Sequence, residues 1–167
     1  GLRINSASDD AAGLQIANRM SANVKGMETA SRNISDATSM LQTADGALEE
    51  LTTIANRQKE LATQAANGVN SADDLTALDA EFQQLSLEVD RIAKNTTYAG
   101  NNLFTAIDGG VTFQIGAGTS ETMKVTSAAP VALANTVKLD TGDNARLAIT
   151  AVDDFIKTVG TSRSTLG

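Results

Sequence analysis

The chain has 167 residues, 41% hydrophobic but only 3% aromatic, and a formal net charge of −7 from 20 acidic and 13 basic residues. It contains no Cys and no His, which excludes disulfides, thiolate chemistry, zinc sites and histidine bases, and with them most hydrolase, redox and metalloenzyme mechanisms. The acidic excess also argues against a nucleic-acid partner and a membrane partner, because phosphates and anionic lipids attract clustered Lys and Arg.

The ends of the sequence add two negative observations and one expectation. No stretch reaches the roughly 18 apolar residues of a transmembrane helix, and no basic-then-apolar signal peptide opens the chain. The chain begins with Gly1 rather than Met and stops at Gly167 within a helical pattern. We therefore interpret it as a fragment or a processed form.

A long N-terminal helix is predicted within residues 1–70. Ser8 is a candidate N-cap whose hydroxyl can accept from an orphan N–H. Two positions then repeat every seven residues, as in helices that pack as a coiled coil. The first set is Met20, Met27, Ile34, Leu41, Leu48, Ala55 and Ala62. The second set is Ala30, Ala37, Ala44, Leu51, Gln58 and Ala65. A helix over 11–66 would be about 80 Å long, too long for a globule, and Gly26 and Gly46 are the candidate break points.

Three further segments follow in chain order. A return helix is predicted over 71–95, with Ser71 as its N-cap and apolar residues at spacings of three and four. A loop and β-hairpin region is predicted over 96–139, where 111–115 and 123–125 alternate apolar and polar residues. A C-terminal helix over 140–167 begins near Asp140 or Thr141 and carries a third apolar stripe. Its members are Ala145, Ala148, Val152, Phe155, Val159 and Leu166.

These patterns predict a mainly α fold: an elongated, coiled-coil-like antiparallel bundle of three helices with a small β-hairpin. No acid, base or nucleophile groups converge in the sequence, so neither a catalytic site nor a cofactor site is predicted. The outer helix faces are rich in Ala, Ser, Thr, Asn and Gln. Such faces suit either repeated self-association or a plain solvated surface, and composition alone does not separate the two.

Residues 1–20 read GLRINSASDDAAGLQIANRM, and this stretch closely resembles the N-terminal signature of bacterial flagellin. The resemblance returns at 30–33, 42–48, 57–62, 95–103 and 113–117. It is strong over about 1–126 and fair over 140–167.

The resemblance implies a structural, non-enzymatic subunit that polymerises into the bacterial flagellar filament and serves motility. Flagellins are exported through the flagellum's own channel, so a secreted, extracellular location in the filament is implied. The implied partners are further copies of the chain, a flagellar export chaperone and the filament cap protein; no cofactor is implied. By this resemblance we expect the family's terminal polymerising helices to lie beyond both ends of this sequence, and only 127–139 stands where many flagellins carry an outer domain.

The resemblance also implies a contact surface for the vertebrate Toll-like receptor that senses flagellin. The residues that match its recognised motif are Arg57, Glu60, Leu61, Gln64 and, on the second helix, Glu81. The planar guanidinium of Arg57 would donate hydrogen bonds to carbonyls or carboxylates of the receptor, and Leu61 would fill a shallow pocket beside it. The alternative is that the charged residues are exposed groups serving subunit–subunit contacts. The sequence departs from the family pattern at Asn56, Lys59 and Thr63.

Three other functions compete with the filament subunit. A hook–filament junction protein shares flagellin's helical ends, but the motif over 57–62 favours flagellin itself. A flagellin-like surface glycan-binding protein would need aromatic platforms, and the chain has only Tyr98 and four Phe. An enzyme is the weakest alternative, because the zinc-protease motifs of some flagellins require His.

Overall fold

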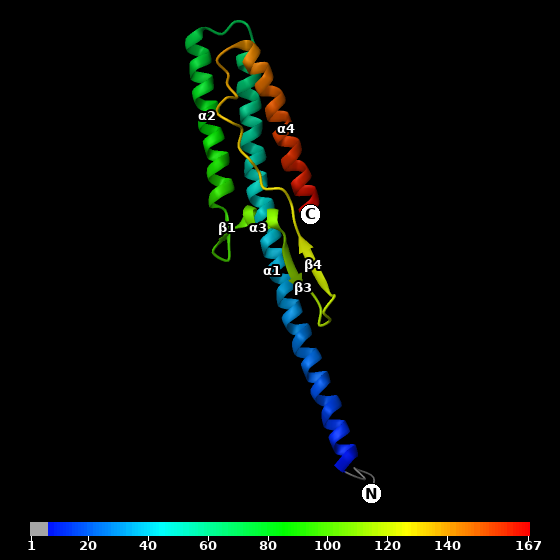
Figure 1. Ribbon diagram of the computed structural model, residues 1–167. Helices are drawn as coiled ribbons and strands as arrows, with labels where there is room; N and C mark the ends of the chain where they lie inside the picture. Colours follow the sequence, from blue (N-terminus) through cyan, green and yellow to red (C-terminus); the bar gives the residue numbers. More distant parts are fainter. Residues whose placement is uncertain (1–6) are drawn as a thin grey trace. The chain divides into compact units, whose positions relative to one another are not determined.

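The computed structural model describes residues 7–167. Residues 1–6, which begin the predicted 1–70 segment and the quoted N-terminal signature, lie outside the described residues. The chain divides into two compact units. The first unit comprises residues 1–39 and 112–124, and the second comprises 40–111 and 125–167. The prediction of a mainly α fold with an antiparallel bundle and a small hairpin is confirmed (Figure 1).

One helix, α1 (Ala7–Ala66), contributes residues to both units: those up to 39 belong to the first unit and those from 40 belong to the second. It runs without interruption through Gly26 and Gly46, so neither glycine breaks it. Ser8, predicted to precede the helix as its N-cap, already lies within α1.

The second unit is a three-helix bundle built from residues 40–66 of α1, α2 (Ala72–Asn95) and α4 (Gly142–Leu166). Figure 1 shows α2 and α4 on either side of this part of α1. Two ion pairs show that α1 and α4 run antiparallel. Lys59 Nζ lies 2.8 Å from Asp153 Oδ1, and Arg163 Nε lies 2.9 Å from Asp45 Oδ1. The predicted third stripe is buried along its whole length, and Ser162 joins it.

Capping residues set the start of both shorter helices. Ser71 accepts from the backbone N–H of Asp74, whose carboxylate accepts from the backbone N–H of Ser71, which forms a complete capping box. Thr141 caps α4 by accepting from the N–H of Asn144. These bonds satisfy N–H groups that have no partner within the helix.

Two small elements of this unit were missed by the sequence patterns. Strands β1 (Thr97–Tyr98) and β2 (Asn101–Asn102) pair antiparallel around Ala99 and Gly100, both of which have positive φ. This is the geometry of a tight two-residue hairpin turn. Helix α3 (Leu103–Gly109) follows, capped by Asn102, with three apolar residues in the core. They are Leu103, Phe104 and Ile107.

The segment 126–139 is extended and is attached to α2 by polar contacts. The carboxylate of Asp79 accepts from the backbone N–H of Leu139 at 2.8 Å. Gln83 donates to the carbonyl of Val137 at 2.9 Å, and the side chain of Leu139 is fully buried. This segment is therefore a strap along one side of the bundle.

The first unit contains residues 7–39 of α1 and the hairpin of β3 (Val111–Gln114) and β4 (Thr122–Val125), whose end residues Val111 and Val125 belong to the second unit. The amide of Asn33 donates to the carbonyl of Gln114 at 2.9 Å, so the hairpin packs on the flank of the helix. In its loop, Gly118 donates its N–H to the carboxylate of Glu121. A Cβ at Gly116 would lie 1.9 Å from that carboxylate, which explains the glycine.

Candidate assembly surface

Three charged side chains on α1 and α2 form a hydrogen-bonded, exposed polar group in the second unit. Arg57 donates to both carboxylate oxygens of Glu81, from Nε at 3.0 Å and from Nη2 at 3.2 Å. Its Nη1 donates to Glu60 at 3.0 Å. We call Arg57, Glu60 and Glu81 the arginine clamp. Lys59, two residues after Arg57 along α1, pairs with Asp153 of α4.

The clamp joins two helices through a planar, bidentate contact. The hydrogen bonds that Arg57 donates, first to Glu81 and then to Glu60, raise the pKa of Arg57 above its ordinary value. The Arg57 side chain is nonetheless 48% exposed and that of Glu81 46%, so water screens the attraction. The clamp therefore orders a surface more than it stabilises the fold.

The five sequence-predicted site residues do not share one environment. The structure brings Arg57, Glu60 and Glu81 together and leaves the side chain of Gln64 exposed. Leu61, expected to fill a pocket in a partner, is only 1% exposed. It faces the bundle core, so within this unit it supports the surface from beneath and cannot project from it.

A buried amide under the clamp was not recognised as such from the sequence. Gln58 occupies a position in the apolar stripe and is 1% exposed. Its Nε2 donates to the hydroxyl of Ser86 at 2.8 Å and to the carbonyl of Phe82 at 3.2 Å. The sequence did contain a sign of this contact: Gln58 is a polar residue in an otherwise apolar stripe, and a buried amide needs a hydrogen-bond partner on the facing helix.

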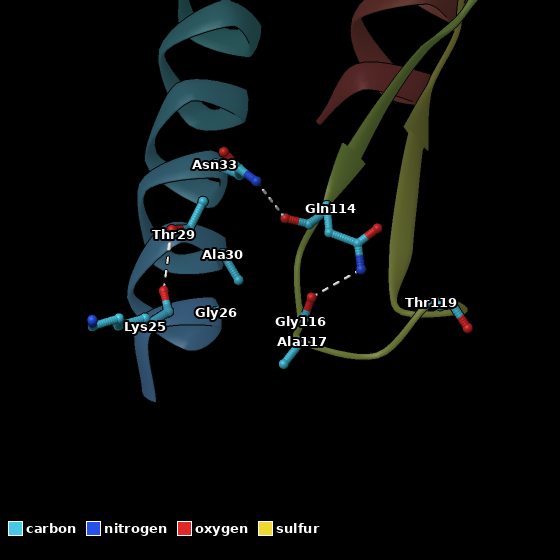
Figure 2. Close-up of a pocket in the computed structure, with 9 residues that line it drawn as sticks. All are labelled: Lys25, Gly26, Thr29, Ala30, Asn33, Gln114, Gly116, Ala117 and Thr119. Carbon is cyan, nitrogen blue, oxygen red and sulfur yellow. Dashed lines mark hydrogen bonds between the residues drawn. The ribbon is translucent and has the colours of Figure 1, made fainter. Parts of the chain in front are cut away.

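A groove of about 480 Å³ lies in the first unit, between α1 and the hairpin loop (Figure 2). Figure 2 shows Asn33 facing Gln114, and Gly26 of α1 opposite Ala117 of the loop. Its lining residues are Lys25, Gly26, Thr29, Ala30, Asn33, Gln114, Gly116, Ala117 and Thr119. None of them is acidic, so the groove offers no carboxylate for acid–base chemistry.

Comparisons with known proteins identify the family. The family described as bacterial flagellin N-terminal helical region matches residues 1–108. Flagellin A of Vibrio anguillarum is 49% identical over 121 residues, which are 72% of this chain and 32% of that protein. The flagellin of Halalkalibacterium halodurans is 42% identical over 173 residues, covering 100% of this chain and 63% of that protein. The chain belongs to the bacterial flagellin family.

A solved structure supports the same assignment. The crystal structure of Bacillus cereus flagellin matches this flagellin chain with a TM-score of 0.72 and 34% sequence identity, covering 81% of each chain. This flagellin chain spans 32% of the length of the Vibrio relative and 63% of the Halalkalibacterium relative. The family is one of structural proteins. Within residues 7–167, no group of three or more metal-binding side chains occurs and no helix is long and apolar enough to cross a membrane.

The first part of α1 in this flagellin chain carries an exposed apolar stripe. We call it the α1 stripe, and its members, which share one face of the helix, are Ile16, Met20, Val24, Met27 and Ile34. The sequence patterns predicted Met20, Met27 and Ile34 in the buried seam, and this prediction is wrong for the described chain. Met20 is 63% exposed, because the hairpin is the element that packs on this part of the helix and it covers the side that carries Ala30.

Proposed function

We propose that this flagellin chain is part of a structural subunit of the bacterial flagellar filament and acts in motility outside the cell. The observation that carries the proposal is the α1 stripe, in a chain whose relatives are named flagellins. Exposed apolar side chains that share one helix face mark an association surface rather than a plain solvated one. The partners of the subunit are further copies of itself, and by family resemblance an export chaperone and the filament cap protein.

The test uses the full-length gene product that contains this region. In polymerising salt, the purified protein should form filaments visible by electron microscopy, and a strain without the gene should lose swimming. A protein that stays monomeric contradicts the proposal. A deletion strain that still builds complete filaments would instead assign the chain to a hook–filament junction or another minor component.

We further propose that the arginine clamp is a lateral contact between subunits. Its support is geometric: three side chains from two helices are held in one exposed, hydrogen-bonded arrangement. Arg57→Ala should raise the protein concentration needed for polymerisation. The matched control is Arg91→Ala, which removes another exposed arginine whose partner Glu88 lies on the same helix. Equal effects of both variants would contradict a specific contact.

A charge reversal separates the two roles of the clamp. In the double variant Arg57→Glu with Glu81→Arg, the pair within one subunit can re-form with opposite polarity. If the clamp only joins α1 to α2, polymerisation should recover relative to Arg57→Glu alone. If a second subunit contacts the clamp, polymerisation of the double variant should stay impaired, because the charges presented to the neighbouring subunit are inverted.

Recognition by the host Toll-like receptor for flagellin is proposed as a second use of the same surface. The exposed motif residues are Arg57, Glu60, Gln64 and Glu81, while Leu61 contributes from the core. Monomeric protein should activate reporter cells that express the receptor, and Arg57→Ala should weaken the response while Arg91→Ala does not. An unchanged response to Arg57→Ala would remove the clamp from this role.

A further inference from the structure

The turn between α1 and α2 contains the one Asn-Gly pair of the sequence, Asn67-Gly68. In such a pair, the backbone nitrogen of the glycine can attack the side-chain amide carbon of the asparagine. Glycine permits the attack because it lacks a Cβ and its backbone is free to adopt the required conformation. The reaction also requires that neither reacting group is engaged in a hydrogen bond.

Both reacting groups are accessible in the turn. Asn67 and Gly68 are exposed, and a Cβ placed at Gly68 would have no atom within 4 Å. Among the described residues, no recorded hydrogen bond engages the side chain of Asn67 or the backbone N–H of Gly68. The backbone of Asn67 is held on both sides: its N–H donates to the carbonyl of Gln64, and its carbonyl accepts from Asn70 at 2.7 Å.

Asn70, in the same turn, has the opposite environment. Its Nδ2 donates to the carbonyls of Gln64 and Asn67, both at 2.7 Å. The nitrogen that would attack it belongs to Ser71, whose N–H donates to the carboxylate of Asp74 in the capping box. In the same turn, therefore, the reacting groups of Asn67 are free of recorded hydrogen bonds, whereas both reacting groups at Asn70 are hydrogen-bonded.

The two Asp-Gly pairs of the chain are constrained as well. Asp45-Gly46 lies inside α1, where the helix occupies the backbone N–H groups, and the Asp45 carboxylate binds Arg163. Asp108-Gly109 forms the end of α3, and the Asp108 carboxylate accepts from the N–H of Ala129. An aspartate at these sites would reach the same cyclic imide with loss of water instead of ammonia, so the reaction would isomerise the residue without changing its charge.

We propose that Asn67 is a site of spontaneous deamidation. The Gly68 nitrogen forms a bond to Cγ of Asn67, the Cγ–Nδ2 bond breaks, and ammonia leaves with the proton from Gly68. Water then opens the resulting cyclic imide at either carbonyl, which yields aspartate or isoaspartate at residue 67. The step needs no enzyme, metal or oxidant, and water is its only co-reactant.

The product changes the end of α1 electrostatically and covalently. Formal charge falls from −7 to −8, because a neutral amide becomes a carboxylate. The new charge lies at the negative end of the α1 dipole, whose last turn contains no basic residue, and it is close in sequence to Asp73 and Asp74. Isoaspartate also lengthens the backbone within the turn that joins α1 to α2.

The test incubates the folded chain in buffer made with heavy-oxygen water, followed by peptide mapping by mass spectrometry. Label and the mass gain of amide-to-acid conversion are expected at residue 67, and they should accumulate faster at higher pH. Gly68→Ala, which the open site accommodates, should slow conversion on the order of tenfold. An isoaspartate-specific methyltransferase should label the wild-type chain and not Asn67→Gln.

A urea-unfolded sample provides the decisive contrast. Asn70 should convert only after unfolding, whereas Asn67 should convert in both states. If Asn67 stays intact in the folded chain but converts in the unfolded chain, the turn protects it and the proposal is wrong. Equal rates at Asn67 and Asn70 in the folded chain would also overturn it, because the hydrogen bonds of the turn would then have no influence.

Discussion

The side-chain amide of Gln58 on α1 and the hydroxyl of Ser86 on α2 form a 2.8 Å hydrogen bond in the core of the bundle. The amide also reaches the carbonyl of Phe82, so the polar group is not left without a partner. A buried donor that loses its acceptor costs about 1–3 kcal/mol, whereas replacing both partners by apolar groups of similar shape is close to neutral.

This pair gives a double-mutant prediction. Ser86→Ala should destabilise the chain by about 1 kcal/mol, because Gln58 keeps only the Phe82 carbonyl. The double variant Gln58→Leu with Ser86→Ala should recover most of that loss or exceed the wild type. Urea unfolding followed by circular dichroism measures all three proteins. A double variant less stable than Ser86→Ala alone would show that the amide has a packing role that leucine does not replace.

Two glycines of α1 should respond differently to alanine. Gly46→Ala should raise the free energy of unfolding by about 0.5–1 kcal/mol, because the helix backbone loses less entropy and nothing lies within 4 Å of the new Cβ. At Gly26 the new Cβ would lie 3.3 Å from Cβ of Ala117. The gain there should be smaller or reversed, and a Gly26→Ala variant stabilised as much as Gly46→Ala would contradict this reasoning.

The capping box of α2 predicts that replacing Ser71 lowers the stability of the second unit. Ser71→Ala should destabilise the second unit by about 1 kcal/mol, since the N–H of Asp74 loses its acceptor at the helix N-terminus. Thermal unfolding provides the measurement, and Ser71→Asp, which restores an acceptor, serves as the control. Equal losses in the two variants would show that the hydroxyl does not act as a cap.

Glu88 gives a prediction about pH. The hydrogen bond from Arg91 lowers the pKa of Glu88 below its ordinary value. A carboxyl group with a depressed folded-state pKa stabilises the fold above its unfolded pKa and loses that contribution as pH falls through the folded pKa. The NMR titration midpoint of Glu88 should rise in Arg91→Ala and stay unchanged in Arg57→Ala. A midpoint that does not respond to Arg91→Ala would assign the shift to another cause.

Local patterns in the sequence were sufficient for much of the fold. Heptad spacing of apolar residues identified the helices of the bundle, and the capping residue Ser71 located the start of α2, because both signals act over a few neighbouring residues. The alternating residues of β3 and β4 identified the hairpin for the same reason. The tight turn at Ala99-Gly100 and the short helix α3 were missed, because each is too short to establish a period.

For the candidate site, the sequence by itself determined that the chain belongs with flagellins and that Arg57, Glu60 and Glu81 are charges on helices. Only the tertiary structure decided which side chains face a neighbour: it closed the arginine clamp, buried Leu61, and gave Gln58 a partner on α2. It also left Met20 exposed, although Leu48, Ala55 and Ala62 of the same heptad series are buried. The physical reason is that periodicity defines a face of a helix, but burial depends on whether another element covers that face.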